Sequence, residues 1–340
     1  MRAWRNAVAV ITIIGLVVFA GVYLFINRQQ SPAKIENRIP LLRKLVAEQQ
    51  QESAQAVTKY LPKNEARIND LGISVAELLR QLPAVVQIEV GVQSDKPTCR
   101  IVHLLDRHFV PKDLYAIDMN NAYGRELSAE EIDQLHQELL LEVEAIQFEQ
   151  MALLRCLIKH HSLKRIFSEG LSPQDMADFK EKVAVLRDME KNQIPEIAKQ
   201  LADVREMLKG MEAKTDRHEK TKKIEAELTG MLDQHKVRLL ELGSPGRLLI
   251  AGEIEAVLPL EDADRLSQAK PISAKGIMKI DPAKLTARRD AQVKAVLDKD
   301  GFGLVVLGGS HDLSDSVRRL GKGSCEYLRI TTKRFKEFSE

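Results

Sequence analysis

The chain has 340 residues, of which 44% are hydrophobic, 29% are charged and 4% are aromatic, and its formal net charge at pH 7 is +2. These values exclude a wholly disordered chain, which would be poor in apolar side chains. They also argue against a nucleic-acid partner, because such a protein needs basic side chains to neutralise phosphates and aromatic rings on which bases stack.

The first element along the chain is an uncharged apolar run over residues 7–26, AVAVITIIGLVVFAGVYLFI. A helix of about 20 such residues crosses about 30 Å of hydrocarbon and satisfies its own backbone hydrogen bonds. A cleaved signal peptide has a shorter apolar region that ends in a small-residue cleavage site, and this sequence shows neither. We therefore expect residues 1–30 to form a transmembrane anchor that contacts the lipid bilayer through residues 7–26.

The charges on either side of this run bear on its orientation. Arg2 and Arg5 precede it, and five basic residues follow it within residues 28–44. A bare count of Lys and Arg keeps the following domain in the cytoplasm, but long domains translocate largely regardless of charge. A short head with two arginines suits the opposite orientation. We expect a single-pass protein of the plasma (inner) membrane whose main domain is extracytoplasmic.

Beyond a polar stalk and entry segment, residues 31–98, we expect one α/β domain over residues 99–340. Short apolar runs alternate there with long helical patterns. The runs that we expect to be strands, with one in the entry segment, are 84–90, 100–105, 164–167, 247–251, 303–307 and 326–330. Strands that alternate with helices predict an α/β fold with a central, mostly parallel sheet flanked by helices.

A helical insertion is expected over about residues 172–242. It opens with Ser172, Pro173 and Asp175, a cap residue followed by proline and an acid in the first turn. Apolar residues then recur at spacings of four and three, as in a coiled-coil seam. They are Ile197, Leu201, Val204, Leu208 and Met211, and later Ile224, Leu228 and Met231. With a turn between residues 210 and 221, the two helices form an antiparallel hairpin, either with its charges in water or as an arm that binds a partner.

Polar side chains follow three of the predicted strands. Asp106 and His108 come after the first strand of the domain, Glu169 after the second, and His311 after Gly308-Gly309-Ser310. Ligands collect at the carboxyl ends of strands in such sheets, so we expect these side chains to share one site. Two imidazoles and two carboxylates are consistent with a divalent metal site or with a metal-free acid–base centre.

His103 lies within the strand at 100–105, on the other face from Asp106 and His108, because successive side chains of a strand alternate. We expect it to be a core histidine. The sequence also lacks the G-x-S-x-G and G-x-x-x-x-G-K-[ST] motifs, which disfavours an ordinary serine hydrolase and a nucleotide site.

The segments 101–108, IVHLLDRH, and 303–311, GLVVLGGSH, resemble motifs of the superfamily that includes the Tiki and TraB proteins, erythromycin esterases and the ChaN-like haem-uptake proteins. Members carry Gly-Glu-x-His or Gly-x-x-His after an early strand and Gly-x-x-His or Gly-x-Gly-His after a late one. Here Leu105 and Asp106 stand in place of the first glycine and glutamate. Glu169-Gly170 is similar to a strand-end Glu-Gly of these proteins, and Thr286–Asp290 is similar to a Glu-Arg-Asn/Asp element.

The resemblance implies that Arg289 lies near the site and holds an anionic group of the substrate. Known roles in the superfamily range from metal-dependent proteolysis to ester hydrolysis and haem binding. We expect a membrane-anchored hydrolase of a small-molecule or peptide substrate, with Asp106, His108, Glu169 and His311 as catalytic groups or as ligands of a divalent metal. The alternatives are a non-catalytic haem- or metal-binding module, with haem disfavoured by the few aromatic residues, and a structural protein whose hairpin recruits a partner.

Overall fold

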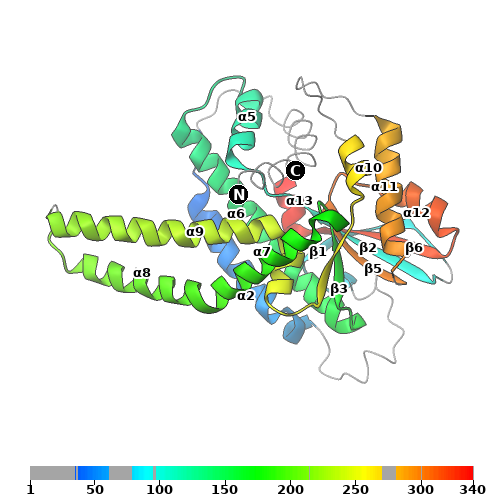
Figure 1. The fold of residues 1–340 in the computed structure, drawn as a ribbon, viewed down its shortest axis with the longest axis horizontal. Coiled ribbons are helices and arrows are strands. Elements are labelled where there is room, and N and C mark those ends of the chain that lie inside the picture. The colour runs from blue at the N-terminus through cyan, green and yellow to red at the C-terminus, as the bar shows by residue number, and fades with distance from the viewer. Residues whose placement is uncertain are drawn as a thin grey trace.

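A computed structural model describes residue 35 and residues 37–60, 79–94, 97–213, 215–269, 281–299 and 301–339. These residues form a six-stranded sheet flanked by helices, which confirms the predicted α/β fold (Figure 1). The strands are β1 (Val85–Val92), β2 (Cys99–Asp106), β3 (Arg165–Ser168), β4 (Ala256–Pro259), β5 (Phe302–Gly308) and β6 (Cys325–Thr332). Their order is β1-β6-β2-β5-β3-β4; β1 pairs antiparallel with β6 and every other neighbouring pair is parallel.

The central strand β2 is buried on both faces, which is why it reads as a continuous apolar run. Val102 and Leu104 are fully buried on one face of the sheet, and Ile101 is fully buried on the other. The longest helices cover the first face, and two C-terminal helices cover the second. This placement leaves the carboxyl end of the strand open to receive functional side chains.

The helices of the described residues are α2 (Ile39–Tyr60), α5 (Lys112–Tyr123), α6 (Ala129–His161), α7 (Met176–Asp188), α8 (Ile194–Lys209), α9 (Asp216–Ile250), α10 (Ala263–Gln268), α11 (Pro282–Leu297), α12 (Ser314–Gly321) and α13 (Lys333–Ser339). The start of α6 shows why the chain turns helical there. The Ser128 hydroxyl accepts the Glu131 N–H, and the Glu131 carboxylate accepts the Ser128 N–H.

The predicted stalk segment contains α2, which packs along α6 in the structure. Leu42, Val46 and Ala56 of α2 are buried, and Val46 and Ala56 belong to the main hydrophobic core. The polar composition of this helix concealed a narrow apolar stripe. This part of the segment therefore belongs to the folded domain.

The expected insertion lies between β3 and β4 and is a helical hairpin, as predicted. Ser172 and Asp175 form the capping box at its start, ahead of α7. Helices α8 and α9 pair with each other and extend away from the sheet (Figure 1). The seam on α8 is as predicted, with Ile197, Leu201 and Val204 buried.

The expected seam on the second hairpin helix is wrong in part. Ile224 is 48% exposed and Met231 is 51% exposed, whereas Thr221 and His235 are buried. Ile224 and Met231 are seven residues apart and Thr221 and His235 are fourteen apart, so a repeat of seven residues fits both pairs. The packing of α8 against α9 turns Thr221 inward. Ile224 and Met231 therefore lie beside the seam instead of in it.

The strand expected at 247–251 is also wrong, because these residues end α9. Gly243 has a φ of 66° and a ψ of 179°, which breaks the helix, and Pro245 sits in the first turn after the break. Leu248 is then fully buried in the core from a helical position. The neighbouring strand is β4, which begins after the turn at Gly252.

Membrane anchoring falls on residues 1–30, which lie outside the described part of the chain. Among the residues that the structure does describe, no helix has the length and apolar character that a membrane span requires. The transmembrane anchor stays a prediction from the sequence.

Candidate functional site

Parallel pairing brings the predicted site residues to one edge of the sheet. The last residue of β2, Asp106, lies opposite Gly308, the last residue of β5, and β3 ends beside β5. Asp106, His108, Glu169 and His311 therefore gather at the carboxyl ends of these three strands, as the sequence predicted.

Glu169 lies at the centre of this cluster, and each of its carboxylate oxygens has two partners. Oε2 accepts from the Gly308 N–H at 2.7 Å and from His108 Nε2 at 2.8 Å. Oε1 accepts from Arg288 Nη2 at 2.9 Å and from His311 Nε2 at 3.1 Å. Burial alone would raise the pKa of this carboxyl, but the charges of His311 and His108 outweigh burial and hold the pKa well below its usual value.

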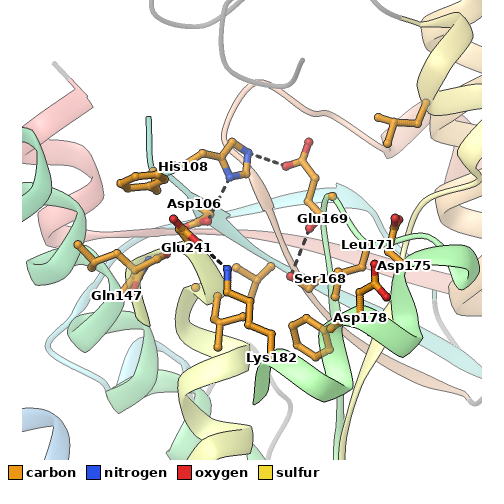
Figure 2. A pocket seen from close by; sticks show the side chains of 18 of the residues that line it. Asp106, His108, Gln147, Ser168, Glu169, Leu171, Asp175, Asp178, Lys182 and Glu241 are labelled. Carbon is orange, nitrogen blue, oxygen red and sulfur yellow. Dashed lines mark hydrogen bonds and ion pairs between the residues drawn. The ribbon is translucent and has the colours of Figure 1, made fainter. Parts of the chain in front are cut away.

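His108 stands between two carboxylates, as Figure 2 shows. Its Nε2 contacts Glu169, and its Nδ1 lies 3.5 Å from Asp106 Oδ2. Burial by itself would lower the pKa of this imidazole, but the two carboxylates outweigh burial and raise the pKa well above its usual value. The raised pKa favours the form of the ring that carries a proton on each nitrogen.

His311 approaches Glu169 from the Gly308-Gly309-Ser310 turn and is 8% exposed. The double glycine is required by space, since a Cβ on Gly308 would lie 2.8 Å from His108 Nε2 and one on Gly309 would lie 2.4 Å from Phe335. The two glycines thus leave room for the side chains of His108 and Phe335. In this position His311 holds the Glu169 carboxylate in place.

Arg288, the neighbour of Arg289, makes the contact with Glu169. It binds Glu261 as well, through Nε at 3.0 Å and Nη2 at 2.6 Å. Burial alone would lower the pKa of this guanidinium, but Glu261 and Glu169 outweigh burial and raise the pKa above its usual value. Arg289 has a buried Nε that has no hydrogen-bond partner among the described residues, and its charge acts on Asp312.

Asp106 is held by a chain of buried side chains from the helices. Gln150 of α6 donates through Nε2 to Asp106 Oδ1 at 2.8 Å and to the Leu105 carbonyl at 3.1 Å. The Ser244 hydroxyl, just past the break in α9, donates to Gln150 Oε1 at 2.7 Å. The carboxylate is therefore oriented from behind while its other oxygen lies beside His108.

His103 is fully buried and is a core histidine, as expected. Burial lowers its pKa to about 3, so the ring is neutral. Its Nε2 donates to the Leu307 carbonyl at 3.0 Å, and its Nδ1 accepts the Tyr327 hydroxyl at 2.7 Å, which in turn accepts the Leu313 N–H. This chain of bonds ties both ends of the Gly308–Leu313 turn to the sheet.

Replacing His103 with leucine is expected to lower the free energy of unfolding by about 2–4 kcal/mol, because it leaves two buried polar groups unpaired. Tyr327→Phe removes only the Tyr327 hydroxyl, but it also leaves two buried groups unpaired, His103 Nδ1 and the Leu313 N–H, so it should lower the free energy of unfolding by about 2–4 kcal/mol as well. Denaturant unfolding at neutral pH measures both. An H103L protein as stable as the wild type would contradict this role.

A pocket of about 220 Å³ opens in front of the cluster. Asp106, His108, Glu169 and Arg288 line its inner wall, whereas His311 is not among the lining residues. Helix α7 and the broken part of α9 supply the opposite wall, where Figure 2 shows Lys182 pointing to Glu241. A substrate in the pocket can therefore reach His108, Asp106 and Glu169.

The predicted metal ligands are occupied by one another. Both nitrogens of His108 and Nε2 of His311 face carboxylate oxygens, and Glu169 has no unpartnered oxygen. In the described part of the chain, no group of three or more His, Cys, Asp and Glu side chains has a metal-binding arrangement.

Sequence reasoning missed Arg288, Glu261, Gln150 and Gln292. Glu261 follows β4 as Glu169 follows β3, and the same strand-end rule would have found it had β4 been predicted. Gln292 donates to Glu261 at 2.9 Å from one turn beyond Arg288 on α11. Gln150 lies within a long helix and carries no signal in the sequence.

Comparison of the chain with family models, with curated proteins and with solved structures finds no match. The resemblance to the Tiki, TraB, erythromycin esterase and ChaN-like superfamily therefore rests on the quoted motifs. Function has to be argued from the site itself.

Proposed function

We propose that this chain is a hydrolase that cleaves an ester or peptide bond at the centre formed by Asp106, His108 and Glu169. The observation that carries the proposal is the position of His108 at the wall of a pocket, with Nε2 2.8 Å from Glu169 and Nδ1 3.5 Å from Asp106. Titratable groups with shifted pKa values in a cleft are typical of acid–base catalysis.

The chemistry follows from the charge that each group carries. His108 holds a proton at neutral pH and delivers it to the leaving alcohol or amine. Asp106 accepts a proton from the attacking water, whose oxygen adds to the carbonyl carbon. The bond to the leaving group breaks as His108 protonates that group, and Asp106 then returns its proton to His108. Glu169, whose pKa is held low by His311 and His108, orients His108 and stabilises its positive charge. His311 and Arg288 are positioning residues in this scheme.

His108→Gln is expected to lower kcat/KM about 10²- to 10⁴-fold, the usual contribution of a positioned acid. The test is a panel of ester and peptide substrates with the full chain in detergent, and His218→Gln on the hairpin is the matched control. An H108Q protein as active as the wild type would remove His108 from the mechanism.

Chelation addresses the metal-dependent variant of the same proposal. We expect turnover to survive a chelator, because the predicted ligands are paired with one another. Loss of turnover on chelation, and its recovery with Zn²⁺ or Mn²⁺, would favour the alternative in which His108, His311, Asp106 and Glu169 bind a divalent ion.

The membrane anchor belongs to the same proposal, supported by the apolar run at residues 7–26. We expect the full chain to stay in the membrane pellet after alkaline extraction. We also expect protease added to the non-cytoplasmic side of sealed cells to digest the α/β domain. Release by alkaline extraction would contradict the anchor, and protection from protease would reverse the orientation.

A further inference from the structure

The candidate pocket has a second wall that the reaction centre does not use. It comes from the base of the inserted hairpin, where α7 faces the break in α9 at Gly243. The charged and aromatic side chains on this wall are Asp175, Asp178, Phe179, Lys182 and Glu241. Because an insertion supplies this wall, it is suited to set substrate preference while the sheet supplies the chemistry.

Negative charge predominates in the pocket. Lys182 pairs with Glu241, Arg288 with Glu169 and Glu261, and His108 with Asp106 and Glu169, so each of these cations faces at least one carboxylate. Asp175 and Asp178 add two further carboxylates to the lining. The net field inside attracts a cationic group and repels an anionic one.

Most of the remaining lining is apolar. Phe179 lies on α7, Leu240 and Leu242 lie at the break in α9, and Leu266 comes from α10. The volume of about 220 Å³ is larger than the roughly 150 Å³ of an engineered apolar cavity that binds benzene. One side chain with an apolar stem fits such a space.

We propose that this pocket selects substrates in which a compact cationic group on an apolar stem, such as the side chain of a lysine residue, lies beside the bond that is cleaved. The cleavage rests on the proposed hydrolase function. The binding preference rests only on the charges, the apolar lining and the size of the pocket.

The test compares two probes that differ in charge and hardly in shape: N-acetyl-lysine amide and N-acetyl-norleucine amide. Titration of the full chain, followed by NMR or calorimetry, should show at least about tenfold tighter binding of the lysine amide at low salt. The preference should shrink as salt screens the carboxylates. Asp178→Asn and Glu241→Gln should each reduce it at least about threefold, whereas Glu206→Gln, an equal charge change on the distant helix α8, should leave it unchanged.

Equal binding of the two amides overturns the inference, and so does the lack of saturable binding of the lysine amide up to the millimolar range. A preference that survives both pocket variants overturns it as well. The corresponding methyl esters separate this inference from the proposed function. If the chain binds the lysine amide more tightly but hydrolyses neither ester, the inference stands and the proposed hydrolase function is wrong. If it hydrolyses both esters at equal kcat/KM, the hydrolase function stands and the inference is wrong.

Discussion

Glu169→Ala is expected to lower the free energy of unfolding by about 3–5 kcal/mol, the cost of removing one partner from a buried ion pair. The side chain is 6% exposed and accepts from Arg288, His108, His311 and the Gly308 N–H. Its loss leaves the Gly308 N–H, Arg288, His108 and His311 without their shared acceptor. Thermal and denaturant unfolding measure the effect.

Two further variants show how much of this loss of stability comes from the charge of Glu169 and how much from its burial. Glu169→Gln keeps the size of the side chain but removes its charge, so we expect a loss of about 2–3 kcal/mol. Glu255→Ala removes the partner of Lys164 in a pair whose side chains are 66% and 64% exposed, and should cost at most about 1 kcal/mol. If the alanine variants at 169 and 255 were equally stable, Glu169 would not be the centre of the cluster.

The same centre shows what the sequence can and cannot predict. Asp106, Glu169 and His311 could be placed together because each follows an apolar run, and parallel strands end at one edge of a sheet. That rule needs only the order of strands and helices. It failed for Glu261 because the sequence placed the neighbouring strand at 247–251, the buried end of α9, instead of at β4.

Helix rotation is the other limit. Arg288 and Arg289 are adjacent, and only the rotation of α11 against the sheet decides which of them contacts Glu169. The hairpin shows the same problem. A repeat of seven residues fits the exposed pair Ile224 and Met231 as well as the buried pair Thr221 and His235. Short apolar runs such as 247–251 suit a buried helix end as well as a strand. In each case the packing between segments distant in the sequence decides which residue faces the core, and the local sequence holds no information on that packing.

The pH dependence of His108 is expected to separate its two possible roles in catalysis. With a pKa well above 6.5, the imidazole is protonated through neutral pH. As an acid it supports turnover at neutral pH, and kcat falls as the pH rises through this raised pKa. As a base it would do the opposite, with kcat rising into the alkaline range. A pH profile of the wild-type kcat decides between them.

Stability should follow the same proton. The unfolded chain binds it with a pKa of about 6.5 and the folded chain with a higher one, so the contribution of His108 is fully present below pH 6.5 and is lost as the pH rises through the raised value. Glu169 acts from the other side: its lowered pKa gives stability above about pH 4.5 that is lost as the pH falls. The ion pair therefore contributes most between about pH 4.5 and 6.5.

The pH dependence of stability that His103 contributes has the opposite sign, so it has to be cancelled before the contribution of His108 can be measured. Its pKa of about 3 means that the folded chain resists a proton that the unfolded chain takes up, so stability falls as the pH drops from 6.5 toward 3. The difference in unfolding free energy between wild type and His108→Gln cancels this contribution, because both chains keep His103. That difference should be largest below pH 6.5 and should shrink above it. A difference that stays constant from pH 5 to 10 would mean that His108 carries no extra proton in the folded chain, and the acid role would then have no physical basis.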